Sequence, residues 1–169
     1  MTGLRADDRW VRMLKPNPAA RIRLFCFPHS GGGIALFRKW PDGLYPSVEV
    51  CAIQLPGRDT RFGEPPYTRL ELLVEALQVA VAPYLDKPFA FFGHSMGALV
   101  SYELIRALAC RGSEYPRHLF ASACRAPHLP SAGLVLHTLP ERKLIAELIA
   151  LGGIPREIAE LPGLLQLFV

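Results

Sequence analysis

Short apolar runs alternate with amphipathic segments along most of the chain. Four runs are compact, apolar and bounded by turn-forming residues, which is the pattern of strands buried inside a sheet. They cover residues 21–28, 48–55, 89–92 and 119–124. The segments between them repeat apolar residues at helical spacing, and they cover residues 33–44, 70–81 and 96–111. Thr68 and Glu71 add a capping-box pattern before the second of these predicted helices.

Strands that alternate with helices predict an α/β fold with a mostly parallel sheet, flanking helices and right-handed crossovers. We assign residues 21–137 to this core. Residues 1–20 are polar and contain two prolines, so they are expected to form an N-terminal arm. The pattern changes in residues 138–169, where the apolar segments 140–151 and 155–168 predict two helices with no strand between them. This pair suits the start of a helical lid, and ordinary packing helices fit the same periodicity.

Composition narrows the function classes. The chain has 169 residues, 50% hydrophobic and 20% charged, which suits one globular domain with a sizeable core. Its net charge of +4 is spread without a dense basic run, which does not favour nucleic-acid binding. No segment resembles a signal peptide or a bilayer span, so a cytoplasmic protein without membrane attachment is expected. The cysteines lack C-x-x-C spacing and are expected to be buried free thiols: Cys26, Cys51, Cys110 and Cys124.

The strongest chemical signal is a serine on a predicted strand-to-helix turn. The sequence G-H-S-M-G at 93–97 follows the strand at 89–92 and leads into the helix at 96–111. This G-x-S-x-G pattern is typical of a nucleophile elbow, in which glycines flank the serine because the turn has no room for side chains. Ser95 is therefore the candidate nucleophile.

A serine nucleophile needs hydrogen-bond donors for the oxyanion that its attack creates. One expected donor is the backbone amide of Met96, the residue after the nucleophile. The second should come from the glycine-rich loop at 28–33, which follows the predicted strand at 21–28. We assign it to the amide of Ser30, with His29 and Gly31 as near alternatives. The glycine run has no Walker lysine, so no nucleotide cofactor is indicated, and we expect neither cofactor nor metal.

Four sequence blocks resemble the signatures of type II thioesterases, the stand-alone editing hydrolases of polyketide and nonribosomal peptide synthesis. The blocks are F-P-H-S-G-G at 27–32, Q-L-P-G-R at 54–58, G-H-S-M-G at 93–97 and R-A-P-H at 125–128. The resemblance implies an α/β-hydrolase that removes aberrant or stalled acyl groups from the phosphopantetheine arm of an acyl or peptidyl carrier protein. It also implies that the reaction passes through an acyl-enzyme on Ser95.

The family pattern further requires an aspartate and then a histidine, both placed after later strands. Nothing after residue 97 matches that pair, and residues 122–132 contain no Asp or Glu. We therefore expect that the last strands and both triad partners are missing. A chain without them should hydrolyse its substrate poorly or not at all.

The histidines of this sequence are weak substitutes for the missing base. His94 is expected to make a structural hydrogen bond, and His29 to fix the glycine-rich loop. His128 follows the fourth predicted strand and is the remaining candidate base, while the other two histidines are expected on the surface or in loops. Arg58 and Asp59, after the second strand, either line the mouth of the pocket or pair with each other.

Two other functions stay open at the level of sequence. The same elbow serves hydrolases of small oxygen esters and acyltransferases. A non-catalytic module that still binds a carrier protein is a third hypothesis, from a different class. Turnover of carrier-bound thioesters against free esters separates the enzymes, and carrier binding without an acyl-enzyme favours the module.

Overall fold

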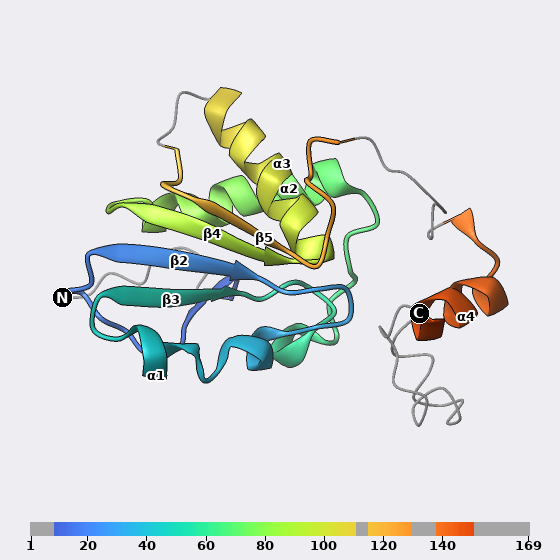
Figure 1. Ribbon diagram of the computed structural model, residues 1–169, viewed down its shortest axis with the longest axis horizontal. Coiled ribbons are helices and arrows are strands. Elements are labelled where there is room, and N and C mark those ends of the chain that lie inside the picture. Colours follow the sequence, from blue (N-terminus) through green and yellow to red (C-terminus); the bar gives the residue numbers. More distant parts are fainter. Residues whose placement is uncertain (1–8, 111–114, 130–137, 151–169) are drawn as a thin grey trace. The chain divides into compact units, whose positions relative to one another are not determined.

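The structure is a computed structural model that describes residues 9–110, 115–129 and 138–150. The chain divides into two compact units, residues 1–127 and 128–169. The first unit is built on a five-stranded sheet with the strand order β1-β3-β2-β4-β5 (Figure 1). Every pairing is parallel except that of β1 with β3, so the predicted, mostly parallel α/β sheet is confirmed. The strands are β1 (Val11–Met13), β2 (Ile22–Phe27), β3 (Val48–Ile53), β4 (Phe89–His94) and β5 (Leu119–Ser122).

Helices cover both faces of this sheet (Figure 1). One face carries α2 (Leu70–Val81) and α3 (Met96–Cys110), and the other carries α1 (Trp40–Leu44) together with the one-turn 3-10 helix η1 (Ile34–Phe37). Two apolar clusters result, one on each side of the sheet. Such burial on both faces explains why successive residues of β2 and β3 are buried rather than alternate ones, and why both strands are apolar except at Arg23 and Glu49.

The expectation that residues 1–20 form only an arm is wrong for residues 11–13. These residues form the edge strand β1, and Val11 pairs with Ile53 of β3. Trp10 and Val11 are buried, and the Trp10 carbonyl accepts a hydrogen bond from the amide of Gln54 at 2.9 Å. The partner of β1 lies about forty residues away in sequence, so no local pattern predicts this strand.

Two helix predictions differ in detail from the structure. The segment 33–44 splits into η1 and α1, because Pro41 has no amide hydrogen with which to continue a helix from the preceding turn. The capping box is not formed: α2 begins at Leu70 after Arg69, with no side-chain cap, so Thr68 lies one position too early.

The cysteines divide into two pairs. Cys26 and Cys51 are buried free thiols, as predicted. Cys110 and Cys124 are exposed, so the prediction is wrong for them. Cys110 ends α3, and Cys124 lies past the end of β5, which stops at Ser122 rather than at residue 124.

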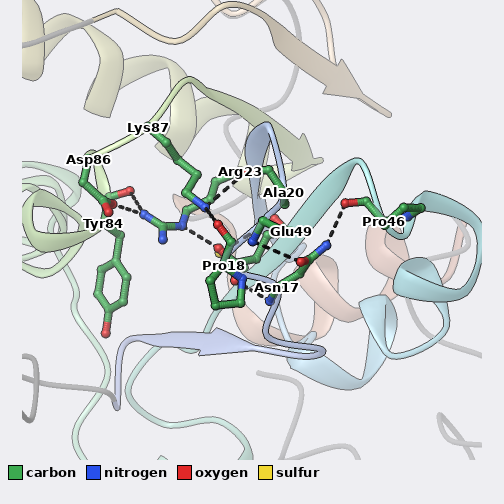
Figure 2. Close-up of polar contacts among 11 residues, drawn as sticks. Asn17, Pro18, Ala20, Arg23, Pro46, Glu49, Tyr84, Asp86 and Lys87 are labelled. Carbon is green, nitrogen blue, oxygen red and sulfur yellow. Dashed lines mark hydrogen bonds and ion pairs between the residues drawn. The ribbon is translucent and has the colours of Figure 1, made fainter. Parts of the chain in front are cut away.

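A buried polar network joins the amino-terminal ends of β2 and β3 (Figure 2). Arg23 Nε donates a hydrogen bond of 2.7 Å to Glu49, and its Nη1 donates to the Tyr84 carbonyl at 2.7 Å and to Asp86. The other Glu49 oxygen accepts the amide of Asn17 at 2.7 Å. The network therefore satisfies a buried ion pair at the end of the sheet opposite the predicted elbow.

In the second unit the structure describes one helix, α4 (Glu141–Ala150), which confirms the first of the two helices predicted after residue 137. Its first turn is closed by the amide of Leu144, which donates to the Pro140 carbonyl at 3.0 Å. The predicted helix at 155–168 lies outside the described residues, and the lid role of 138–169 stays a prediction. In the described part of the chain, no helix combines the length and apolar character that crossing a bilayer requires.

Candidate active site

Three parallel strands bring their carboxyl ends to one edge of the sheet. Phe27 at the end of β2 lies opposite Gly93 in β4, and His94 lies opposite Ser122 in β5. The loop after β2, the turn after β4 and the end of β5 are therefore neighbours. Open α/β sheets bind their ligands at this kind of edge.

Ser95 occupies the turn between β4 and α3 in a strained conformation. Its φ is +52°, in the left-handed region that costs an ordinary residue about 1–2 kcal/mol. Two hydrogen bonds hold it there: its amide donates to the Ser122 carbonyl at 2.8 Å, and its carbonyl accepts from the Ala98 amide at 3.0 Å. The Ser95 residue is exposed. Strain of this kind presents a side chain to solvent at a fixed point above the sheet.

The glycines on either side of Ser95 are sterically required. A Cβ on Gly93 would overlap backbone atoms of Gly97 and Ala98. A Cβ on Gly97 would overlap the carbonyl oxygens of Phe27 and Pro28. The first turn of α3 therefore packs directly on the end of β2, which brings the elbow against the glycine-rich loop.

The glycine-rich loop is a tight turn. Gly31 has a φ of +75°, and the Gly32 amide donates to the His29 carbonyl at 3.0 Å. The His29 Nδ1 donates to the Ser30 carbonyl at 2.7 Å. Met96 is the first residue of α3, so its amide has no acceptor within the helix. The assignment of the two oxyanion donors to Met96 and Ser30 stays a prediction.

The two histidines nearest the elbow contact each other. The rings of His29 and His94 lie edge to face with centroids 5.7 Å apart, and His94 Nδ1 shares a hydrogen bond of 3.1 Å with the Ser122 hydroxyl. Within the described ranges, neither imidazole makes a hydrogen bond to Ser95. His128 is exposed and belongs to the second unit, so its candidacy as a base stays a prediction.

In the loop after β3, the neighbours Arg58 and Asp59 contact different groups. Arg58 donates to the carbonyl of its neighbour Gly57 at 2.8 Å, whereas the Asp59 carboxylate accepts the amide of Ile34 at 2.9 Å. Each residue thus has a partner of its own, and the predicted alternative of an Arg58–Asp59 pair is not what these contacts show. The link from Asp59 to the glycine-rich loop was missed, since its only sequence signal is an acidic residue after a Pro-Gly turn.

Comparison with family models decides the classification. Residues 22–169 match the model described as "Thioesterase domain". The chain belongs to the thioesterase domain family. The match contains β2, the glycine-rich loop, the elbow and α4, so every part of the candidate site lies within the thioesterase domain.

Curated relatives of this thioesterase domain include two bacterial proteins with gramicidin in their names. It is 45% identical over 155 residues to "Linear gramicidin dehydrogenase LgrE" of Brevibacillus parabrevis, which covers 92% of this chain and 59% of the relative. It is 41% identical over 160 residues to "Gramicidin S biosynthesis protein GrsT" of Aneurinibacillus migulanus, covering 95% and 62%. The chain thus spans about three fifths of the length of these relatives.

Solved structures give the same family. The thioesterase domain superposes with a TM-score of 0.78 and 32% identity on "YbtT", whose structure is described as a type II thioesterase from the yersiniabactin NRPS/PKS biosynthetic pathway. The superposition covers 94% of this chain and 64% of that one. The α/β-hydrolase fold and the resemblance to type II thioesterases are both confirmed by these matches.

Proposed function

We propose that this protein hydrolyses acyl thioesters carried on the phosphopantetheine arm of a carrier protein, through an acyl-enzyme on Ser95. The observation that carries the proposal is the strained, exposed Ser95 between two glycines that cannot carry a side chain. A left-handed serine at the carboxyl end of a central strand costs stability, and a nucleophile is the established use of that geometry.

The proposed reaction has two balanced steps. In the first, the Ser95 oxygen bonds to the thioester carbonyl carbon, the C–S bond breaks, and the serine proton passes through a base to the departing thiol. In the second, water attacks the acyl-enzyme, the free acid leaves and the proton returns to Ser95. The negative oxygen of both tetrahedral intermediates would be held by the amides of Met96 and Ser30.

The carrier-bound substrate is supported by the relatives and by charge. GrsT is named for gramicidin S biosynthesis, and YbtT for a pathway of peptide and polyketide synthases. Carrier proteins are acidic, and the net charge of +4 on this chain favours their approach. Cytoplasmic location and a contribution of Arg58 and His128 to the pocket stay predictions.

The name of LgrE calls it a dehydrogenase, and a dinucleotide-binding dehydrogenase needs a different glycine spacing from the one in this chain. A dinucleotide fingerprint after a first strand requires a third glycine or alanine five positions after its first glycine. Counted from Gly31, that position is Leu36. The glycine-rich loop of this chain therefore fits an oxyanion hole better than a pyrophosphate.

Whether a general base serves Ser95 distinguishes an enzyme from a binding module. No described imidazole makes a hydrogen bond to Ser95, which favours the non-catalytic carrier-binding module as the second candidate. The two hypotheses differ in one covalent species, the acyl-enzyme. That species is the direct target of the experiment.

The test incubates the full gene product with a hexanoyl carrier protein and follows intact masses. We expect a hexanoyl adduct on Ser95, release of free carrier thiol, and loss of turnover by about a thousandfold or more in Ser95→Ala. A p-nitrophenyl ester serves as the carrier-free substrate. Carrier binding without any adduct would overturn the enzyme in favour of the module, and turnover of the free ester alone would overturn the carrier-bound substrate.

A further inference from the structure

The loops after β2 and β3 are joined by one side chain. The Asp59 carboxylate accepts the amide hydrogen of Ile34 at 2.9 Å, across 25 positions of sequence. Ile34 is the first residue after the glycine-rich loop and begins η1. Gly33, which precedes it, offers no side chain that could accept this amide. The acceptor is therefore supplied from the neighbouring loop.

Asp59 has a fixed position from which to make this contact. Its φ is +48°, a left-handed conformation that aspartate tolerates better than most residues. Arg61, two positions later, is buried: its Nη1 donates to the Gln54 carbonyl at 3.0 Å, and its guanidinium lies 4.2 Å from the centre of the Trp10 ring. Arg61 thus anchors the loop, and Asp59, itself exposed, is held with its carboxylate at the amide of Ile34.

The glycine-rich loop is shaped to receive the carboxylate. A Cβ built on Gly33 would overlap both carboxylate oxygens and the Cγ of Asp59. The absence of a side chain at Gly33 therefore serves the contact with Asp59. Two observations therefore agree: Gly33 leaves room for the Asp59 carboxylate, and that carboxylate accepts the next amide, that of Ile34.

The contact fixes one end of the segment that holds the predicted oxyanion donor. The other end is fixed by β2, because Phe27 pairs with Gly93. Between these two points lie only six residues, with the turn from His29 to Gly32 at their centre. The direction of the Ser30 amide therefore depends on both ends.

We propose that Asp59 is a positioning residue for the oxyanion hole, which it orients by holding the glycine-rich loop through the amide of Ile34. This inference rests on the proposed function and adds to it a residue outside the serine elbow. Asp59 does not touch the substrate in this scheme. It acts through the direction of the Ser30 amide.

The test compares three variants of the full gene product. Asp59→Ala removes the acceptor, Asp59→Asn keeps an acceptor oxygen and tolerates the left-handed backbone, and Asp42→Ala removes an exposed aspartate of α1 as the matched control. For Asp59→Ala we expect kcat on the acyl carrier to fall about tenfold to a hundredfold with little change in KM, because displaced catalytic groups act on the transition state. Asp59→Asn should recover most of this loss.

Two further measurements separate positioning from general damage. Affinity for a trifluoromethyl ketone, which forms an oxyanion on the serine, should fall in parallel with kcat in Asp59→Ala. Hydrogen exchange in the peptide covering residues 28–36 should accelerate in the same variant and stay unchanged in Asp59→Asn. The urea midpoint reports any global loss of stability.

The outcomes are distinguishable from a failure of the proposed function. Wild-type protein that forms no adduct on Ser95 overturns the proposed function, and the catalytic role of Asp59 with it. Wild-type protein that forms the adduct, with Asp59→Ala equal to it in kcat and ketone affinity, overturns this inference alone. A loss that Asp59→Asn does not restore, or that Asp42→Ala shares, also overturns it.

Discussion

The buried ion pair between Arg23 and Glu49 offers the sharpest prediction about stability. Both side chains are almost fully buried, with exposed fractions of 4% and 2%. Burial lowers the pKa of Arg23, but its hydrogen bonds to Glu49 and Asp86 and their charges outweigh this effect and hold that pKa above its usual value. Arg23 therefore stays charged, and Glu49→Ala leaves that charge with less compensation.

The magnitude follows from the bonds that are lost. Glu49 accepts two hydrogen bonds of 2.7 Å, from Arg23 Nε and from the Asn17 amide. Hydrogen bonds to charged groups contribute about 1.5–3 kcal/mol each. Breaking a buried pair costs about 3–5 kcal/mol, and the two estimates agree for Glu49→Ala. Arg23 keeps the Tyr84 carbonyl and Asp86, which holds the loss within this range rather than above it.

The assay is urea unfolding near neutral pH, followed by far-ultraviolet circular dichroism, with the slope of the transition checked against wild type. The control is Glu103→Ala, which removes the partner of Arg106 in a surface pair of 2.9 Å, where the loss should be below about 1 kcal/mol. The double variant Arg23→Met/Glu49→Leu should regain part of the loss, because no buried charge is left alone. A loss in Glu49→Ala no larger than in Glu103→Ala would refute the reasoning.

Three further predictions concern glycine, thiol burial and pH. Gly97→Ala should lower the free energy of unfolding by about 3 kcal/mol or more, because the new Cβ would meet backbone oxygens that cannot move aside. In the same urea assay, Gly43→Ala is the control: its Cβ meets nothing within 4 Å, and it should stabilise helix α1 by about 0.5–1 kcal/mol. Ellman's reagent should react quickly with Cys110 and Cys124 in the folded protein and slowly with Cys26 and Cys51, and equal rates at all four thiols would contradict the burial. Burial, with a contribution from Cys51, raises the pKa of the Cys26 thiol. A thiol whose pKa is raised by folding contributes stability that is complete below the unfolded-state pKa of about 8.5, and this stability is lost as pH rises above that value, because the unfolded chain ionises first. Between about pH 7.5 and about pH 9.5, the free energy of unfolding of wild type should therefore fall by about 1 kcal/mol more than that of Cys26→Ala.

Local sequence patterns predicted the parts of this domain that local geometry determines. The apolar runs predicted β2 to β5 to within two residues at every end, and the elbow followed from the glycines around Ser95. Gly93 must lack a side chain because of backbone atoms a few residues away, and Gly97 because of backbone atoms at the end of the adjoining strand β2. A nucleophile elbow can therefore be predicted from a short segment of sequence.

Features that depend on distant partners were missed. Strand β1 exists because Val11 meets Ile53, and Trp10 packs against Arg61. The role of Asp59 depends on Ile34 in another loop. The capping box failed for a different reason, because the N-cap position is Arg69, one residue after Thr68, and competing helix starts differ by small energies. The exposure of Cys124 likewise depends on where β5 ends.

The two ends of the sheet have opposite roles. Each of the parallel strands is followed, at its carboxyl end, by a residue in the left-handed region: Gly31 after β2, Gly57 and Asp59 after β3, Ser95 after β4 and Ala123 after β5. The amino-terminal end instead carries the satisfied network around Arg23 and Glu49. The non-glycine residues among the left-handed ones, Asp59, Ser95 and Ala123, carry backbone strain at the end that holds the nucleophile, whereas the far end carries strong polar contacts, a distribution expected where a site must stay preorganised at a cost in stability. Substitutions in the network should therefore change the free energy of unfolding without changing the geometry around Ser95.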